Sequence, residues 1–468
     1  MRFVALLHRW LGIFGCLLFI TWFASGIVMI YARMPELAPH ERLDRAPVLD
    51  LSTATLSPSD AAAKHQLLPQ RATVGMLLGR PVYRFQDRSG PVMVFADNGA
   101  RFDGFSRDDA MREIDRAYPI EIPAIPAYDA RITESDQWTL QERAQLPMHR
   151  VMLRDREQTV VYLSDVSGQV AVRTTARARR LAYGGAVLHW LYFTPLRKNG
   201  PLWNQAIIWL SLAGSVLCAL GLIWGFSVGW QSPYTGWMKW HHYAGLIFGA
   251  FTFTWVFSGL LSMDPWDWHP STAPTRAQRD AFSGGPLQLA RVSLEDLRAA
   301  IAARPASPPK EIEIAQFRGE PRVIVDSRPP EPIDRNILTA TAREAMPSVP
   351  IDDVALLDAY DSYYYGRGEA DGTRPLPVLR VRYADPVHTW LYIDPRRGAI
   401  LRKEERLSRV NRWLYHGLHS LDFPWLYDRR PLWDLVVIIL SLGGIASAVT
   451  SAVPAWRRLR RHAQRLYT

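Results

Sequence analysis

Cysteine is scarce in this chain of 468 residues, which contains only Cys16 and Cys218. Both lie inside long apolar runs, and they form no C-x-x-C arrangement. The polar stretches between the apolar runs contain no cysteine, which excludes a disulfide framework there. We therefore expect both cysteines to be small apolar packing residues.

Several enzyme motifs are also missing. The sequence has no H-E-x-x-H zinc motif, no Walker A loop and no dinucleotide-binding fingerprint. A site for a nicotinamide or flavin cofactor is therefore not recognisable.

The sequence does contain four apolar segments, each about 20 residues long, which is the length that crosses a hydrocarbon core of about 30 Å. They cover residues 7–31, 203–229, 240–263 and 432–454. None has a charged residue deep inside it or a helix-breaking Pro/Gly pair, so a transporter is the weakest functional hypothesis. No A-x-A cleavage site follows the first segment, and we expect it to remain as a membrane anchor.

The formal net charge of +10 has a membrane explanation. Basic residues flank the first and last apolar segments, as in Arg2, Arg9 and the tail 457–468. Such short basic flanks follow the positive-inside rule, so we do not expect a nucleic-acid partner. The same rule places both termini in the cytoplasm, and the long stretches 32–202 and 264–431 on the other side of the membrane.

The first apolar segment recurs later in the chain. Residues 7–29 match residues 240–262 at a spacing of 233 positions, which places His8 on His241. The same spacing aligns Gly12 with Gly245, Thr21 with Thr254, Trp22 with Trp255, Ser25 with Ser258 and Gly26 with Gly259. A second match, at a spacing of 230, places His189 on His419, and each of these precedes another apolar segment. Such self-similarity indicates two tandem copies of one unit.

We therefore expect an α-helical membrane protein: a four-span bundle built from two tandem repeats, with two α+β extracytoplasmic domains. The predicted divisions are span 1 at 1–32, domain A at 33–180, an interfacial helix and span 2 at 181–230, a cytoplasmic turn and span 3 at 231–264, domain B at 265–410, an interfacial helix and span 4 at 411–456, and a basic cytoplasmic tail at 457–468. Strands are expected at 82–85, 92–95, 159–163, 311–314, 322–325, 376–382, 388–393 and 399–401, and helices at 106–118 and 293–303.

The second copy ends with the pattern HTWLYIDPRRGAIL at 388–401, followed by RWLYHGLHSLDFPWL at 412–426. Together with the histidine-led spans, this pattern resembles the PepSY-associated transmembrane proteins, and the resemblance covers most of the chain. Some members of that family are haem-containing inner-membrane proteins that reduce ferric siderophores, and others are iron-regulated membrane proteins. The resemblance implies PepSY-like folds for both extracytoplasmic domains. The first copy departs from the pattern, because Gly185-Ala186 stands where the second copy has Tyr415 and His416.

Histidines stand near both ends of the predicted spans, where ionisable residues indicate function. His8 and His241 would lie at the cytoplasmic ends of spans 1 and 3, and His189 and His419 at the outer approaches to spans 2 and 4. Haem iron accepts axial imidazoles, and helical bundles hold cofactors between facing helices. If the two copies face each other, His8 pairs with His241 and His189 with His419, which gives two haem b sites on opposite faces.

Glycines accompany two of these histidines. Gly12 and Gly245 each follow a histidine by four residues, on the same helix face. Because a glycine leaves room for a flat macrocycle against the backbone, we interpret both as haem-packing residues. Gly26 and Gly259 are interpreted as helix-packing positions.

The remaining histidines have weaker patterns. His242 and His416 are alternative iron ligands, hydrogen-bond partners of a ligand, or interfacial residues. His149, His269 and His388 lie in the long loops, and we interpret them as surface or turn residues.

These observations predict a transmembrane electron-transfer protein that passes electrons from a cytoplasmic or quinol donor to an acceptor outside. The resemblance implies a ferric siderophore as acceptor, whose iron is released because ferrous iron binds hard oxygen ligands less well. The tyrosines at 360–365, with Arg367, either contact such a chelate or belong to an ordinary loop, and we favour the loop. The alternative function is a membrane-anchored PepSY module that binds or regulates an envelope peptidase or another partner.

Overall fold

The computed structural model describes residues 2–119, 126–326, 331–366 and 374–466. The chain divides into two compact units. The membrane unit comprises Met1–Pro35, Arg177–Pro270 and Arg409–Thr468, and the sheet unit comprises Glu36–Ala176 and Ser271–Ser408. Each unit therefore takes residues from both halves of the sequence.

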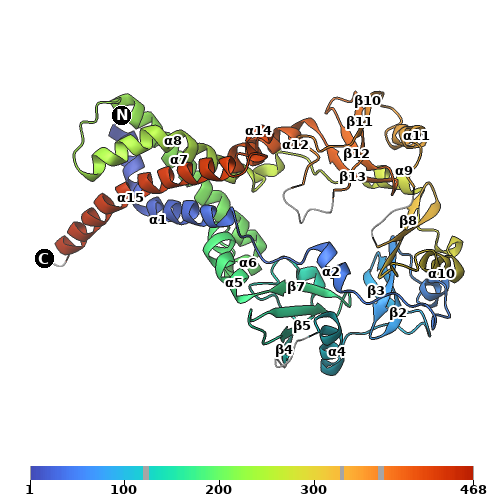
Figure 1. Ribbon diagram of the computed structural model, residues 1–468. Coiled ribbons are helices and arrows are strands. Elements are labelled where there is room, and N and C mark those ends of the chain that lie inside the picture. Colours follow the sequence, from blue (N-terminus) through green and yellow to red (C-terminus); the bar gives the residue numbers. More distant parts are fainter. Residues whose placement is uncertain (1, 120–125, 327–330, 367–373, 467–468) are drawn as a thin grey trace. The chain divides into compact units, whose positions relative to one another are not determined.

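Four helices of the membrane unit are long and apolar enough to cross a membrane: α1 (Arg2–Met29), α7 (Gly200–Val228), α8 (Trp237–Leu261) and α15 (Leu432–Leu466). Each coincides with one of the predicted apolar segments. They lie side by side as a bundle in which α1 and α8 each contact both α7 and α15 (Figure 1).

The surface of this bundle is apolar. Large side chains on three different helices, such as Phe14, Trp209 and Ile439, are more than half exposed. A helix that exposes apolar side chains in this way suits lipid, where its backbone groups are satisfied internally. The structure therefore supports a lipid bilayer as the environment of this unit.

The helix α15 extends beyond the predicted fourth span. It continues through Pro454 to Leu466, so the basic residues expected in a separate tail from position 457 prolong the helix (Figure 1).

Short helical segments lead into α7 and α15. Before α7 the chain forms α5 (Ala176–Ala182), the π-helical turn η2 (Tyr183–Val187) and α6 (Thr194–Lys198). Before α15 it forms α12 (Arg406–Asn411), the π-helical turn η5 (Arg412–Gly417), α13 (Leu418–Ser420) and α14 (Pro424–Tyr427). A π-helical turn thus precedes each of the histidines predicted at the outer approaches, and such turns are frequent at functional sites.

In the sheet unit, strands from both long loops join in one antiparallel sheet of the order β3-β2-β1-β8-β9. Its strands are β1 (Arg71–Leu77), β2 (Arg80–Asp87), β3 (Gly90–Phe95), β8 (Ile312–Phe317) and β9 (Glu320–Val325). Ala72 of β1 lies opposite Ile314 of β8, and both side chains belong to one hydrophobic core. The expectation of separate domains at 33–180 and 265–410 is therefore corrected, because the two loops bury their apolar faces together.

Two further antiparallel sheets have four strands each, in sequence order. The first contains β4 (Ala127–Ile132), β5 (Met148–Met152), β6 (Val160–Ser164) and β7 (Val170–Thr174), and the second contains β10 (Ile351–Leu357), β11 (Val378–Tyr383), β12 (Trp390–Asp394) and β13 (Ala399–Glu404). The expected strands are confirmed, whereas β1, β4, β5, β7 and β10 were not predicted. The sequence thus predicted α+β structure correctly but missed five of the thirteen strands in the described part of the chain.

Each of the two four-stranded sheets contains the same kind of Tyr–Asp–Arg contact. In the first, the Tyr162 hydroxyl donates to Asp136 (2.7 Å), which also accepts from Arg150 (3.1 Å). In the second, the Tyr392 hydroxyl donates to Asp361 (2.9 Å), which accepts from Arg380 (3.0 Å). The tyrosines and the arginines are each 230 positions apart, the spacing that relates His189 to His419.

The helices of the sheet unit are α2 (Pro39–Arg45), α3 (Pro58–Lys64), α4 (Arg107–Ala117), α9 (Arg276–Ser283), α10 (Leu294–Ala302) and α11 (Arg335–Ala345). Short 3₁₀ turns lie at η1 (Arg143–Gln145) and η4 (Leu289–Arg291), and η3 (Pro265–Asp267) follows α8 in the membrane unit. Ser106 and Ser293 cap α4 and α10, which confirms the two predicted helices and stabilises each by about 0.5–2 kcal/mol.

Candidate functional site

The structure brings the four predicted ligand histidines together in two pairs within the membrane unit. The ring centroids of His8 and His241 are 6.1 Å apart, and those of His189 and His419 are 6.0 Å apart. A bond from a metal to an imidazole nitrogen is about 2 Å long, so two imidazoles on opposite sides of one metal have centroids roughly 6 Å apart. Both pairs therefore have the spacing of a two-imidazole metal site.

All four imidazoles are oriented by a backbone carbonyl. The Nδ1 atoms of His8 and His241 lie 3.0 Å from the carbonyl oxygens of Leu217 and Ser447, respectively. A carbonyl only accepts hydrogen bonds, so Nδ1 carries the proton and donates it. Nε2 is then the unprotonated nitrogen, which is the one able to coordinate a metal.

The second pair has the same arrangement with an added hydroxyl. His189 Nδ1 lies 3.1 Å from the Trp22 carbonyl oxygen, and 3.2 Å from Ser25 Oγ. His419 Nδ1 lies 3.0 Å from the carbonyl oxygen of Trp255, with Ser258 Oγ at 3.2 Å. Each serine hydroxyl donates to a backbone carbonyl of its own helix, which leaves its oxygen free to accept from the imidazole.

Tryptophans fix the segments that carry these two histidines. Trp203, in the first turn of α7, donates its indole N–H to the Trp190 carbonyl (2.8 Å), directly after His189. Trp433 at the start of α15 donates in the same way to the Ser420 carbonyl (2.9 Å), directly after His419. Each histidine-bearing segment is therefore attached to the helix that follows it.

Glycines lie directly against three of the imidazoles. A Cβ atom at Gly26 would lie 3.6 Å from His189 Cε1, and one at Gly259 would lie 3.4 Å from His419 Cε1. A Cβ at Gly221 of α7 would come within 2.7 Å of His8 Cε1, which is closer than two carbon atoms can approach. Only Gly221 is therefore required for its imidazole to lie where it does, whereas the contacts at Gly26 and Gly259 are ordinary ones, as expected of helix-packing positions.

The two predicted haem-packing glycines differ from each other. A Cβ at Gly245 would meet nothing within 4 Å, whereas one at Gly12 would make an ordinary contact with Leu217 Cδ1 at 3.8 Å. The open space beside Gly245 is consistent with a ligand there. The contact at Gly12 shows that helix packing also accounts for this residue.

The other histidines contact residues outside the two pairs. His242 is buried, with Nε2 2.9 Å from the Gly229 carbonyl, and the His416 ring lies 4.6 Å from that of Tyr415, which also contacts His419. His149 is only 1% exposed and contacts Asp165 through Nε2 and Tyr128 through Nδ1. The prediction of a surface position for His149 is therefore wrong.

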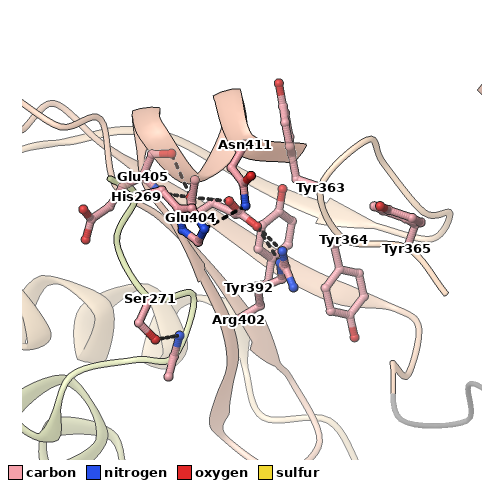
Figure 2. A network of polar contacts seen from close by, with 12 residues as sticks. His269, Ser271, Tyr363, Tyr364, Tyr365, Tyr392, Arg402, Glu404, Glu405 and Asn411 are labelled. Carbon is pink, nitrogen blue, oxygen red and sulfur yellow. Dashed lines mark hydrogen bonds and ion pairs between the residues drawn. The ribbon is translucent and has the colours of Figure 1, made fainter. Parts of the chain in front are cut away.

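Two further predicted loop histidines also make local contacts. His269 Nδ1 lies 3.2 Å from the Pro270 carbonyl, and its Nε2 lies 3.0 Å from the side-chain amide of Asn411 (Figure 2). His388 has positive φ (51°) and lies inside the turn that the Asp385–Thr389 hydrogen bond closes, as expected of a turn residue.

The tyrosine cluster at 360–365 is largely internal structure of the second four-stranded sheet. Tyr364 is fully buried and stacks on Tyr392 at 5.2 Å; both are labelled in Figure 2. Its hydroxyl donates to the Pro375 carbonyl. Burial raises the pKa of both tyrosines, so their hydroxyls stay protonated. Arg367 lies outside the described residues.

The two histidine pairs lie at different depths of the bundle. On α1, His8 is 14 residues from Trp22, whose carbonyl holds the second pair, and on α8 the same number separates His241 from Trp255. At about 1.5 Å per residue this is an axial distance of about 21 Å. The pairs therefore form two separate sites within one bundle.

Each pair offers a metal two nitrogen ligands. No cluster of three or more His, Cys, Asp or Glu side chains that could hold a metal ion occurs among the residues described. The four equatorial nitrogens of a tetrapyrrole would complete a six-coordinate iron between two imidazoles. Spacing and tautomer thus leave two imidazole nitrogens at each pair able to bind one metal.

Comparison of the chain with known protein families and with curated proteins finds no match.

Proposed function

We propose that the chain is a transmembrane electron-transfer protein that holds two b-type haems, one between His8 and His241 and the other between His189 and His419. The observation that carries this proposal is the recurrence of one geometry. Both pairs have centroids about 6 Å apart, as a metal between two imidazoles requires, and every Nδ1 is held by a backbone carbonyl.

The residues around each pair have defined roles in this proposal. The four imidazoles would hold haem iron through Nε2, and the carbonyls of Leu217, Ser447, Trp22 and Trp255 fix their tautomer. The hydroxyls of Ser25 and Ser258 add a second acceptor at one pair only. Because hydrogen bonds to an axial imidazole raise its basicity, the two sites should have different reduction potentials.

We also infer that the chain consists of two copies of one unit. The same contacts recur at the spacings found in the sequence: Trp203 corresponds to Trp433, and Leu217 to Ser447. A two-copy bundle places each histidine opposite its counterpart, which produces symmetric pairs. The family resemblance supports PepSY-like structure in the sheet unit.

A bound haem would supply one-electron transfer, and two of them would connect the two faces of the membrane. The basic flanks favour His8 and His241 on the cytoplasmic side and the sheet unit outside the inner membrane. The donor is then a cytoplasmic reductase or quinol. As acceptor we propose a ferric siderophore, which takes up one electron at iron and releases ferrous ion.

The first test is the haem content of the detergent-purified protein. We expect two b-type haems per chain by pyridine haemochrome analysis, with sharp α and β bands on dithionite reduction, as six-coordinate two-histidine haems give. Ferrous iron should then accumulate when the reduced protein is mixed with a ferric hydroxamate. A correctly folded protein that stays free of haem in haem-replete cells would exclude the proposal.

A substitution at Gly221 tests the position of the His8 imidazole. Gly221→Ala places a methyl group where His8 Cε1 lies 2.7 Å away, and the imidazole, at the tip of its side chain, must turn out of its contact with Leu217. We expect the variant to lose the haem at this pair and to keep the other. The measurement is haem content combined with a redox titration.

The control for this variant is Gly225→Ala, one turn further along α7. Its Cβ meets only the flexible tip of Leu246, at 3.2 Å, and no histidine. Equal haem loss in the two alanine variants would show that helix packing, not the imidazole, causes the defect.

A further inference from the structure

A cavity in the sheet unit lies outside the histidine pairs. It is enclosed by α2, the strands β1 and β2, the end of α4, the turn between β6 and β7, and the start of β8. Its enclosed volume is about 60 Å³, which is room for a few water molecules, and the cavity opens to solvent. Four cationic side chains and two acidic ones line it: Arg42, Arg45, Arg84, Lys310, Glu113 and Glu311.

Both acidic side chains are already neutralised. Glu311 accepts two hydrogen bonds from Arg42, at 3.0 and 3.3 Å, and Glu113 pairs with Arg116 at 2.7 Å. Burial alone would raise the pKa of Glu311, but Arg42 and other neighbours lower it below its usual value. Neither carboxylate is therefore available to balance the remaining cations.

The other three cations contact neutral groups. Arg84 donates to the carbonyls of Ser167 (3.0 Å) and Met76 (3.1 Å), and Lys310 to the carbonyl of Asp44. Burial lowers the pKa of Arg84 to about 10, which leaves it charged at neutral pH.

The guanidinium of Arg45 lies over the ring of Tyr118, 4.4 Å from its centroid, so it too faces a neutral group. The lining of the cavity thus has a surplus of positive charge.

A buried hydroxyl adds an unused hydrogen-bond donor. Tyr118 lines the cavity and is only 6% exposed, yet no described residue provides a partner for its Oη. Burial raises the pKa of Tyr118, so the hydroxyl keeps its proton and can donate it. Buried polar groups are rarely unpaired, and this one therefore suggests a ligand.

We propose that this cavity binds a small organic anion with two carboxylates. Arginine forks bind carboxylates through paired hydrogen bonds, and the surplus cations Arg45, Arg84 and Lys310 would balance the two charges. The Tyr118 hydroxyl donates to one carboxylate. The apolar lining, which includes Met76, accommodates a short carbon chain, and inorganic phosphate has none.

The substitution Tyr118→Phe separates binding from folding. It removes only an unpaired hydroxyl, so we expect the ligand-free protein to be at least as stable thermally as the wild type. A hydrogen bond from this hydroxyl to a carboxylate is lost, which should weaken binding about tenfold or more. The matched control is Tyr83→Phe, whose hydroxyl donates to the Leu56 carbonyl (2.7 Å) away from the cavity; it should lower stability and leave binding unchanged.

Isothermal titration of the detergent-purified full chain, at constant ionic strength, measures this effect with succinate and glutarate. Succinamide has the same skeleton without charge, and inorganic phosphate has charge without the skeleton; we expect both to bind at least about tenfold more weakly. Arg45→Gln, which breaks no ion pair, should also weaken dicarboxylate binding. Absence of saturable binding of either acid, binding of phosphate as tight as that of the acids, or equal affinity in wild type and Tyr118→Phe would overturn the proposal.

Discussion

His8→Ala and His189→Ala are each expected to remove one of the two proposed haems and to stop the proposed electron transfer across the membrane. Each substitution takes away one axial ligand, and a buried haem held by a single imidazole at this site loses half of its protein bonds to iron. The two sites lie about 21 Å apart along α1, so neither can replace the other. Loss of one haem therefore interrupts the path completely.

The measurement uses vesicles that contain the purified protein and a trapped ferric hydroxamate with a ferrous-specific dye. Dithionite added outside reduces the wild type, and dye colour should develop inside. In both variants the dye colour should develop as slowly as in protein-free vesicles. The double variant should contain no haem. His40→Ala and His242→Ala serve as controls, because His40 lies in the sheet unit and His242 faces the Gly229 carbonyl.

Two outcomes would contradict this expectation. If both single variants keep two haems, the histidine pairs are not the ligands. If one haem is lost but transfer continues at the wild-type rate, the haems do not form a single path. Haem loss in His242→Ala would instead make that residue the ligand on α8.

The sequence was sufficient to predict the histidine pairs because each histidine has the same place in both copies of the repeated unit. His8 and His241 share a spacing with Trp22 and Trp255, so a symmetric bundle brings them together without any knowledge of side-chain contacts. The four spans followed from apolar length in the same way. An apolar run is a local pattern, and a repeat is an exact match between two segments. Both can therefore be recognised in a single sequence.

Contacts between distant segments could not be predicted in this way. The pairing of β1 with β8 joins residues about 240 positions apart. The alternation of apolar and polar residues identifies a strand but does not indicate which other strand it pairs with. The serines at 25 and 258 were visible as part of the repeated cluster, but only the structure shows that their hydroxyls meet His189 and His419. Gly221 belongs to no repeated motif, since position 451, at the matching spacing, is a serine.

Gly245→Leu is expected to abolish haem binding between His8 and His241 without destabilising the haem-free protein. A Cβ at this position would have no other described side chain or element within 4 Å, and replacing glycine inside a helix by leucine gains roughly 0.5–1 kcal/mol of helix propensity. Gly245 lies one turn after His241 on the same helix face, where a macrocycle bound to that imidazole would extend. A leucine would occupy that space.

Without haem, the Gly245→Leu variant should therefore melt at the same temperature as haem-free wild type or slightly higher. Purified from haem-replete cells, the variant should contain one haem where the wild type contains two. Ala250→Leu adds bulk to the exposed face of the same helix and should leave both haems bound. Gly12→Leu is a less specific test, because its side chain would also press on Leu217. Retention of both haems in Gly245→Leu would show that no macrocycle lies over this glycine, and the open space beside it would then need another occupant, such as lipid.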